Sequence, residues 1–201
     1  MLQVEKYGNF KGLGKFKKKK QIVLCHTSRE VGEYLTSLKF RYNGRYDKIP
    51  HYVITKGGTV LQLLDDYSYT NFLFNEKTNQ NSIVICLENL GWLQRKPLST
   101  GYINWNGSIY IDEVYEKKWR DYFFWAKYKE EQIETCSQLC NSLMDNLKIE
   151  KRFVGHNTKV DGVEKFEGIV TRSNFDSRYT DLNPSFDFSS FLKKIENEQY
   201  S

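Results

Sequence analysis

Two of the three histidines in this chain stand where metal ligands are often found. His26 follows the apolar run 22–25, and His156 follows the apolar run 153–155. Both runs have the composition of buried strands, and adjacent strands of one sheet would bring the two imidazoles to the same edge. Neutral imidazole is the commonest protein ligand for metals. The two histidines therefore predict a metal site that one further donor would complete.

Asp181 is the candidate for that third donor. It stands in the segment 180–186, shortly before Pro184, and proline stiffens the backbone around it. Two histidines and a carboxylate with an open fourth position suit hydrolytic zinc, which lowers the pKa of bound water to about 7 and polarises a carbonyl group. The alternative is structural, because a histidine that ends a strand is often simply hydrogen-bonded in place.

Five segments in order, 23–28, 51–60, 81–87, 154–156 and 181–186, carry a further signal. Together they resemble the zinc-dependent N-acetylmuramoyl-L-alanine amidases of type 2. This superfamily includes small phage lysozyme-like amidases and peptidoglycan recognition proteins. The resemblance implies that Zn²⁺ is held by His26, His156 and Asp181. It also implies hydrolysis of the peptidoglycan bond between N-acetylmuramic acid and L-alanine.

The spacing of the ligands departs from the family. About ten residues usually separate the second and third ligands, and Arg172 stands at that place. Because arginine stays protonated and has no lone pair to offer a metal, His156 is preferred as the ligand. The segment 157–174 is then an insertion, expected to cover or edge the active cleft, and Arg172 is assigned to substrate binding.

The proton-transfer partner does not carry over directly. The family's acid/base position on the central strand falls on Cys86, and Glu88 lies one pleat further on the same face. Tyr179 stands two residues before Asp181, where the family often has lysine. Glu88 and Tyr179 are therefore the two candidate catalytic residues.

Two further residues are assigned to substrate binding, each with a structural alternative. Trp92 follows the central strand and would stack on a sugar. The alternative is an ordinary core tryptophan, because its ring buries a large area. His51 would line the cleft, although one histidine at a strand start is commonly structural.

The pattern of apolar residues predicts a single α/β domain with a mixed central sheet flanked by helices. We divide the chain into a basic, irregular arm, 1–20, and an amidase-like domain, 21–201. Hairpins are expected around Gly57 and around Asn106-Gly107, the strongest such signal in the chain. The other expected strands are 21–25, 82–87 and 153–156. The expected helices are 29–39, 116–147 (one broken or two successive) and 188–198.

Charge and composition bear on two other possibilities, binding to nucleic acid and insertion in a membrane. The chain has 201 residues and a net charge of +5, with its densest basic block at 17–20. This block would attract an anionic cell wall or nucleic acid, or is a solvated segment; no nucleic-acid-binding motif accompanies it. No apolar run reaches the roughly 20 residues of a membrane span.

The cysteines and the N-terminus bear on where the chain works. Cys25 and Cys86 are expected as buried thiols, and Cys136 and Cys140 as core residues one helical turn apart. No secretory signal is evident. We expect synthesis in the cytoplasm and action at the cell wall as a monomer, as in a phage lysis protein. The alternative function is a non-catalytic peptidoglycan-binding module.

Overall fold

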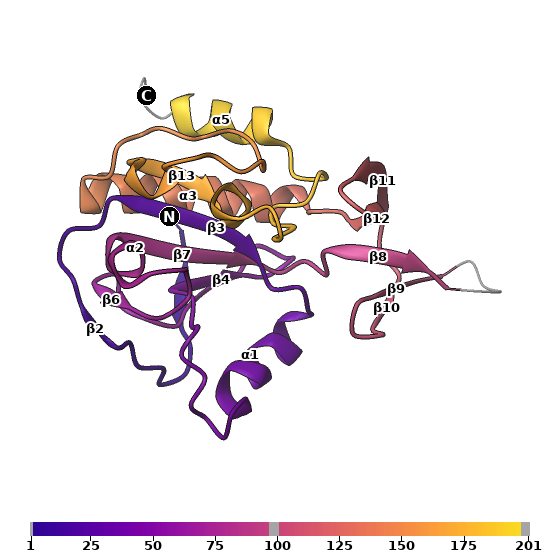
Figure 1. Ribbon diagram of the computed structural model, residues 1–201, viewed down its shortest axis with the longest axis horizontal. Coiled ribbons are helices and arrows are strands. Elements are labelled where there is room, and N and C mark those ends of the chain that lie inside the picture. Colours follow the sequence, from indigo (N-terminus) through magenta and orange to yellow (C-terminus); the bar gives the residue numbers. More distant parts are fainter. Residues whose placement is uncertain (1, 97–100, 198–201) are drawn as a thin grey trace.

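A six-stranded mixed sheet with the order β1-β5-β4-β7-β3-β13 forms the centre of the fold (Figure 1). The computed structural model describes residues 2–96 and 101–197. β3 and β4 both run parallel to β7, and β13 runs parallel to β3. β4 and β5 are antiparallel. The strands are β1 (Val4–Lys6), β3 (Gln21–His26), β4 (Tyr52–Ile54), β5 (Val60–Gln62), β7 (Ser82–Leu87) and β13 (Gly168–Thr171).

Both faces of this sheet are covered, which explains the continuous apolar strands. Ile22 and Leu24 of β3 point into one core, while Val23 and Cys25 point into the other. The first core is closed by α3 (Glu130–Leu147) and α5 (Phe188–Asn197). The second is closed by α1 (Val31–Phe40), which lies on the opposite side in Figure 1. The predicted α/β class is confirmed.

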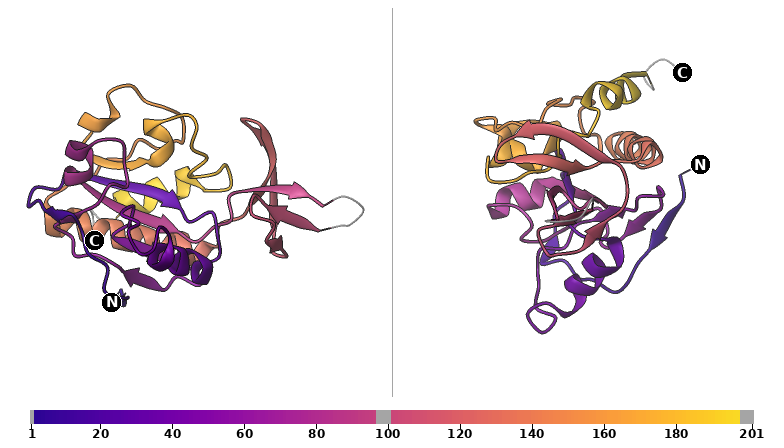
Figure 2. Two further views of the ribbon diagram at one scale, coloured as in Figure 1. Left: turned by 60° about the horizontal axis from the view of Figure 1, so that its bottom comes forward. Right: turned by 90° about the vertical axis from the view of Figure 1, so that its right-hand side faces the viewer.

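A second sheet of five antiparallel strands projects from one end of the first (Figures 1 and 2). Its hairpin around Gly107 matches the prediction. The expected helix at 116–147 is wrong in its first part, where aromatic residues form a hairpin instead; a half-exposed aromatic run suits a strand better than a helix. The strands are β8 (Trp92–Arg95), β9 (Tyr102–Asn104), β10 (Ile109–Tyr110), β11 (Val114–Trp119) and β12 (Tyr122–Ala126).

The N-terminal segment is more ordered than the sequence suggested. β1 forms an edge of the main sheet, and β2 (Gly14–Lys15) pairs with β6 (Ser68–Tyr69). Within the basic block, Lys19 is buried and its Nζ donates to the carbonyls of Ser68, Gln80 and Ser82. Burial lowers the pKa of Lys19 to about 8. At least one lysine of the block is therefore a packing residue.

The strand beside β3 is β13, and the expected strand at 153–156 is not formed. Phe153 makes only an isolated bridge to Ile169 of β13. The segment 157–174 is therefore not a simple insertion over the cleft, because its second half supplies a core strand and begins the short helix α4 (Arg172–Phe175). Of the two apolar runs, 153–155 and 168–171, the second forms the strand beside β3. Its Ile169 and Val170 are fully buried. The remaining helices are α2 (Glu76–Asn81) and the 3-10 turn η1 (Val163–Lys165).

The cysteines divide into two pairs. Cys25 and Cys86 are direct partners on β3 and β7 and form a disulfide, so the expectation of two buried thiols is wrong. Sequence reasoning missed it because 61 residues separate them and only the sheet register makes them neighbours. Cys136 and Cys140 are free and buried on α3, as expected.

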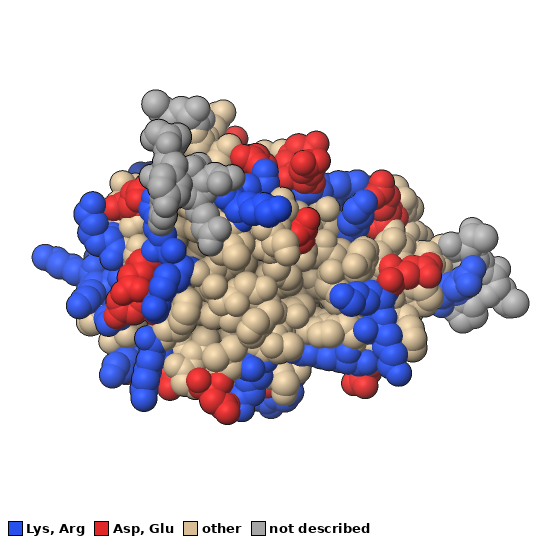
Figure 3. All heavy atoms as spheres, turned by 90° about the horizontal axis from the view of Figure 1, so that it is seen from above, with Lys and Arg blue, Asp and Glu red and all other residues tan. Residues whose placement is uncertain are grey.

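Surface charge is mixed on the face shown in Figure 3. On this face, Lys and Arg lie mainly near the outer edge, many beside Asp or Glu, and the centre is largely uncharged. This face therefore lacks the continuous basic stripe that nucleic-acid binding uses. Within the part of the chain that is described, no helix is long and apolar enough to cross a membrane.

Candidate functional site

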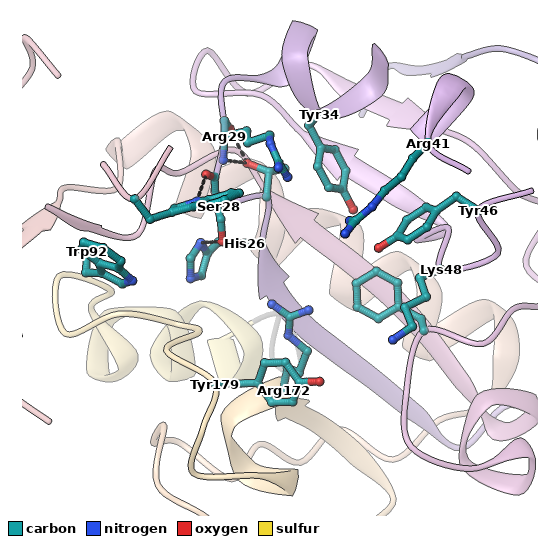
Figure 4. Close-up of a pocket in the computed structure, with 13 residues that line it drawn as sticks. His26, Ser28, Arg29, Tyr34, Arg41, Tyr46, Lys48, Trp92, Arg172 and Tyr179 are labelled. Carbon is teal, nitrogen blue, oxygen red and sulfur yellow. Dashed lines mark hydrogen bonds between the residues drawn. The ribbon is translucent and has the colours of Figure 1, made fainter. Parts of the chain in front are cut away.

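A hollow of about 580 Å³ opens where β3 and β13 end and the second sheet begins. Its lining comes from α1, from the loop after α1, from both sheets and from the chain after α4 (Figure 4). Aromatic and basic residues dominate. The lining residues are His26, Thr27, Ser28, Arg29, Tyr34, Arg41, Tyr46, Lys48, Phe72, Trp92, Trp105, Arg172 and Tyr179.

Three residues, His26, Arg172 and Asp181, form what we call the floor of the hollow. His26 Nε2 lies 3.0 Å from Asp181 Oδ1. Arg172 donates two hydrogen bonds to the same carboxylate, from Nε to Oδ2 and from Nη2 to Oδ1, the second at 3.0 Å. His26 and Asp181 are almost fully buried, and the Arg172 side chain is 19% exposed. The structure therefore brings together two of the three expected metal ligands, with Arg172 beside them.

The charges of the floor balance within it. Burial would raise the pKa of Asp181, but the Arg172 guanidinium and His26 together outweigh burial and hold that pKa well below its usual range. Burial would likewise lower the pKa of Arg172, and the Asp181 carboxylate raises it instead. A bidentate arginine–carboxylate pair is a strong and directional contact. Asp181 is therefore an ionised, fully engaged carboxylate.

The local fold fixes Arg172 at this point. Arg172 follows β13 and is the first residue of α4, whose start is a capping box between Thr171 and Asn174. Asn174 Oδ1 accepts from the Thr171 amide at 2.7 Å. The Ser173 amide donates to the Asp181 carbonyl at 3.2 Å, which ties the two charged residues together through the backbone. The sequence pattern Thr-x-x-Asn was the available signal for this turn.

His26 is held from the opposite side by a close approach of backbone. A Cβ on Gly91 would lie 2.7 Å from His26 Cε1, and Gly91 has φ +78°. Only glycine fits this combination without displacing the ring. His26 Nδ1 lies 3.3 Å from both the Asn89 carbonyl and Ser28 Oγ. Its Nε2 is buried and faces Asp181 Oδ1 at 3.0 Å.

His156 lies apart from the floor. It is exposed and does not line the hollow. Its Nδ1 is 2.9 Å from Thr158 Oγ1, and its carbonyl accepts from Asn174 Nδ2 at 2.9 Å. The strand expected at 153–156 does not form, and the place beside β3 is taken by β13, which ends at Thr171 and is followed by Arg172.

The residues present do not fit the zinc site that the resemblance implied. His26 Nε2 and Asp181 Oδ1 converge, 3.0 Å apart, as two ligands would. The third position is occupied by a guanidinium, which has no lone pair for a metal. Among the described residues, no group of three histidine, cysteine, aspartate or glutamate side chains is placed to hold a metal ion.

Glu88 and His51 serve the framework around the hollow and do not line it. Glu88 Oε1 accepts from the Val31 amide at the start of α1, and Oε2 accepts from the Lys56 amide. Burial raises the pKa of Glu88 despite these two bonds. His51 Nδ1 accepts from the Val84 amide at 3.0 Å, and Nε2 lies 2.9 Å from the Ser68 carbonyl.

Tyr179 and Trp92, by contrast, both face the hollow (Figure 4). The Arg172 guanidinium lies 4.4 Å from the centre of the Tyr179 ring. Trp92 stacks on Tyr122 of the second sheet at 4.5 Å, which sets the orientation of its indole. Trp105 joins it from the loop between β9 and β10 and donates to the Ser28 carbonyl at 2.9 Å.

Sequence reasoning missed the basic residues at the opening. Arg29, Arg41 and Lys48, which we call the rim, line the hollow, and none forms an ion pair with any described residue. Apart from the buried Asp181 of the floor, no acidic side chain of the described residues stands at the hollow. The signal was present in the basic, aromatic loop 41–48, but nothing in the sequence placed that loop next to His26.

Comparison with solved structures identifies the fold. The E. coli N-acetylmuramyl-L-alanine amidase AmiD, solved with anhydro-N-acetylmuramic acid-L-Ala-D-gamma-Glu-L-Lys, matches at 15% identity and TM-score 0.54, over 90% of this chain and 59% of AmiD. The Clostridium intestinale endolysin amidase LysCS matches at 12% and 0.58, over 97% and 96% of the two chains. Staphylococcus aureus AmiA matches at 10% and 0.60, over 98% and 83%.

A family model gives the sequence-level result. The model for N-acetylmuramoyl-L-alanine amidase matches residues 15–167. The match includes His26 and ends before Arg172 and Asp181. Asp181 completes the expected ligand set, whereas Arg172 departs from it. A search of curated proteins found no match. Since the model covers well over half of the sequence, the chain belongs to the N-acetylmuramoyl-L-alanine amidase family.

Proposed function

We propose that the hollow binds a muramoyl-peptide fragment of peptidoglycan at the cell wall. The observation that carries this is a hollow with an unpaired basic rim, in a chain of this family. A peptide stem carries free carboxylates, which Arg41 and Lys48 would attract, and charge-assisted hydrogen bonds are the strong ones.

The aromatic residues suit the sugar part of such a ligand. Trp92 lies beside His26 on the side of the second sheet (Figure 4), and Trp105 lines the same hollow. Indole rings offer large, rigid apolar area with one polar end, which matches the apolar face of a sugar ring. We place the sugar near these rings and the peptide near the rim. The AmiD structure, solved with a muramoyl peptide, supports this choice of ligand class.

A direct binding measurement tests the proposal. Anhydro-N-acetylmuramoyl-tripeptide is titrated into the protein and into an Arg41→Met/Lys48→Met variant by calorimetry. We expect the double variant to bind about 10-fold or more weakly, since each lost charged contact is worth roughly 1.5–3 kcal/mol. The matched control, Lys17→Met/Lys18→Met, removes two exposed positive charges that do not line the hollow. Equal losses in both variants, or no binding at all, would contradict the proposal.

Hydrolysis of the bond between N-acetylmuramic acid and L-alanine is the second candidate. Membership of the family favours it. Tyr179 is the proposed proton-transfer residue, because it faces the hollow, whereas both carboxylate oxygens of Glu88 are occupied by backbone amides. Mass spectrometry of the same incubations would detect separation of sugar from peptide. Turnover that survives Tyr179→Phe would remove that residue from the role.

A further inference from the structure

We infer that Arg172 takes the place of the metal ion in this chain, so that the floor is stable and charge-balanced without zinc. This disagrees with the zinc site that the family resemblance implied. It concerns metal content and does not depend on which ligand the hollow binds.

The first argument is position. β13 is parallel to β3, with Thr171 opposite Leu24, so the residue after Thr171 reaches the edge where His26 stands. Arg172 is that residue, and it precedes Asp181 by nine positions, close to the spacing at which a second ligand was expected. At the position expected for the second metal ligand, this chain therefore has Arg172, whose side chain itself carries a positive charge.

The second argument is electrostatic. A zinc ion would neutralise the Asp181 carboxylate, which is 2% exposed and costly to bury alone. The Arg172 guanidinium does this with two hydrogen bonds to the same carboxylate. It packs between Tyr179, at 4.4 Å, and Phe72, at 5.5 Å, so its own position is fixed. Entry of a second cation would place two positive charges on one carboxylate.

The third argument is that the remaining ligands are still poised for a metal. His26 Nε2 and Asp181 Oδ1 lie 3.0 Å apart, and both side chains are almost fully buried, so the two donor atoms already converge on one point. A single exchange, Arg172→His, would remove the guanidinium and supply an imidazole beside them. Two histidines and a carboxylate are a catalytic zinc set. The inference thus predicts a gain of metal binding from one substitution.

The test measures zinc by mass spectrometry after dialysis against excess zinc and then against buffer. We expect wild-type protein to keep less than about 0.1 zinc per chain, and Arg172→His to keep about one, in line with a three-ligand site. Adding His26→Ala to Arg172→His should remove that zinc. The matched control, His156→Ala, should change neither background, because His156 lies away from the floor.

Several outcomes would overturn the inference. One zinc per wild-type chain would do so, and its loss in His156→Ala would restore the ligand set expected from the sequence. A folded Arg172→His protein without zinc would also overturn it. If Arg172→His folds only with zinc present, its melting temperature should rise with zinc concentration while that of the wild type stays constant. The wild-type measurement decides the matter even if the variant does not fold.

Discussion

The floor and the rim of the hollow use the same residue type in opposite ways. Two hydrogen bonds hold Arg172 against Asp181, so its charge is neutralised inside the protein. Arg41 is exposed, lies over the rings of Tyr42 and Tyr46, forms no ion pair with a described residue, and so keeps its charge for a ligand. Burial, which neither the residue type nor its local sequence reveals, decides whether an arginine holds the fold or serves binding.

The histidines repeat this contrast. His51 is buried with both ring nitrogens beside backbone groups, whereas His156 is exposed and contacts only Thr158 through its ring. Sequence patterns assigned both to the site, and the structure places neither at the hollow. Changes in buried members of these pairs should therefore affect stability, and changes in exposed members should not.

The largest expected effect is that of Arg172→Met. This change leaves the Asp181 carboxylate buried without its partner, so we expect the free energy of unfolding to fall by about 3–5 kcal/mol. Urea unfolding followed by circular dichroism measures it. The double variant Arg172→Met/Asp181→Leu should recover much of the loss. A single variant as stable as the wild type would show that the floor is not the stabilising pair that its burial indicates.

A smaller effect is expected from pH. Burial lowers the pKa of His51 to about 3, against about 6.5 in the unfolded chain. Between these values the unfolded state binds a proton that the folded state does not, so the stability that neutral His51 gives is complete above about pH 6.5 and is lost as pH falls toward 3. The slope it adds is at most about 1.4 kcal/mol per pH unit.

His51→Gln removes the titrating group and should flatten the pH dependence of the free energy of unfolding in this range. His156→Gln, the exposed counterpart, should leave it as in the wild type. Unfolding curves at pH 4, 5, 6 and 7 would compare the three proteins. Equal slopes for the wild type and His51→Gln would show that another group carries the dependence.

The smallest effect on stability is expected at the rim. Arg41→Met/Lys48→Met removes two exposed charges without ion pairs, so the free energy of unfolding should change by no more than about 0.5 kcal/mol. The same variant is expected to lose ligand affinity. A loss of stability comparable to that of Arg172→Met would mean that the rim supports the fold, and the contrast with the floor would fail.

Much of the framework was open to prediction because it depends on local pattern. The apolar run of β7 and the hairpins around Gly57 and Asn106-Gly107 appear where they were expected. Helices α1 and α5 agree with prediction to within about two residues, the usual uncertainty of helix ends. In these cases neighbouring residues carry the whole signal, through the period of burial or the geometry of a turn.

The sequence by itself determined the α/β class, the family and two members of the floor, His26 and Asp181. Only the tertiary structure decided which apolar run became the strand beside β3, and with it that Arg172 and not His156 reaches the sheet edge. The same holds for the disulfide between Cys25 and Cys86. Each depends on which of several strands pair, and pairing is settled by burial summed over the whole sheet, which no local stretch of sequence contains.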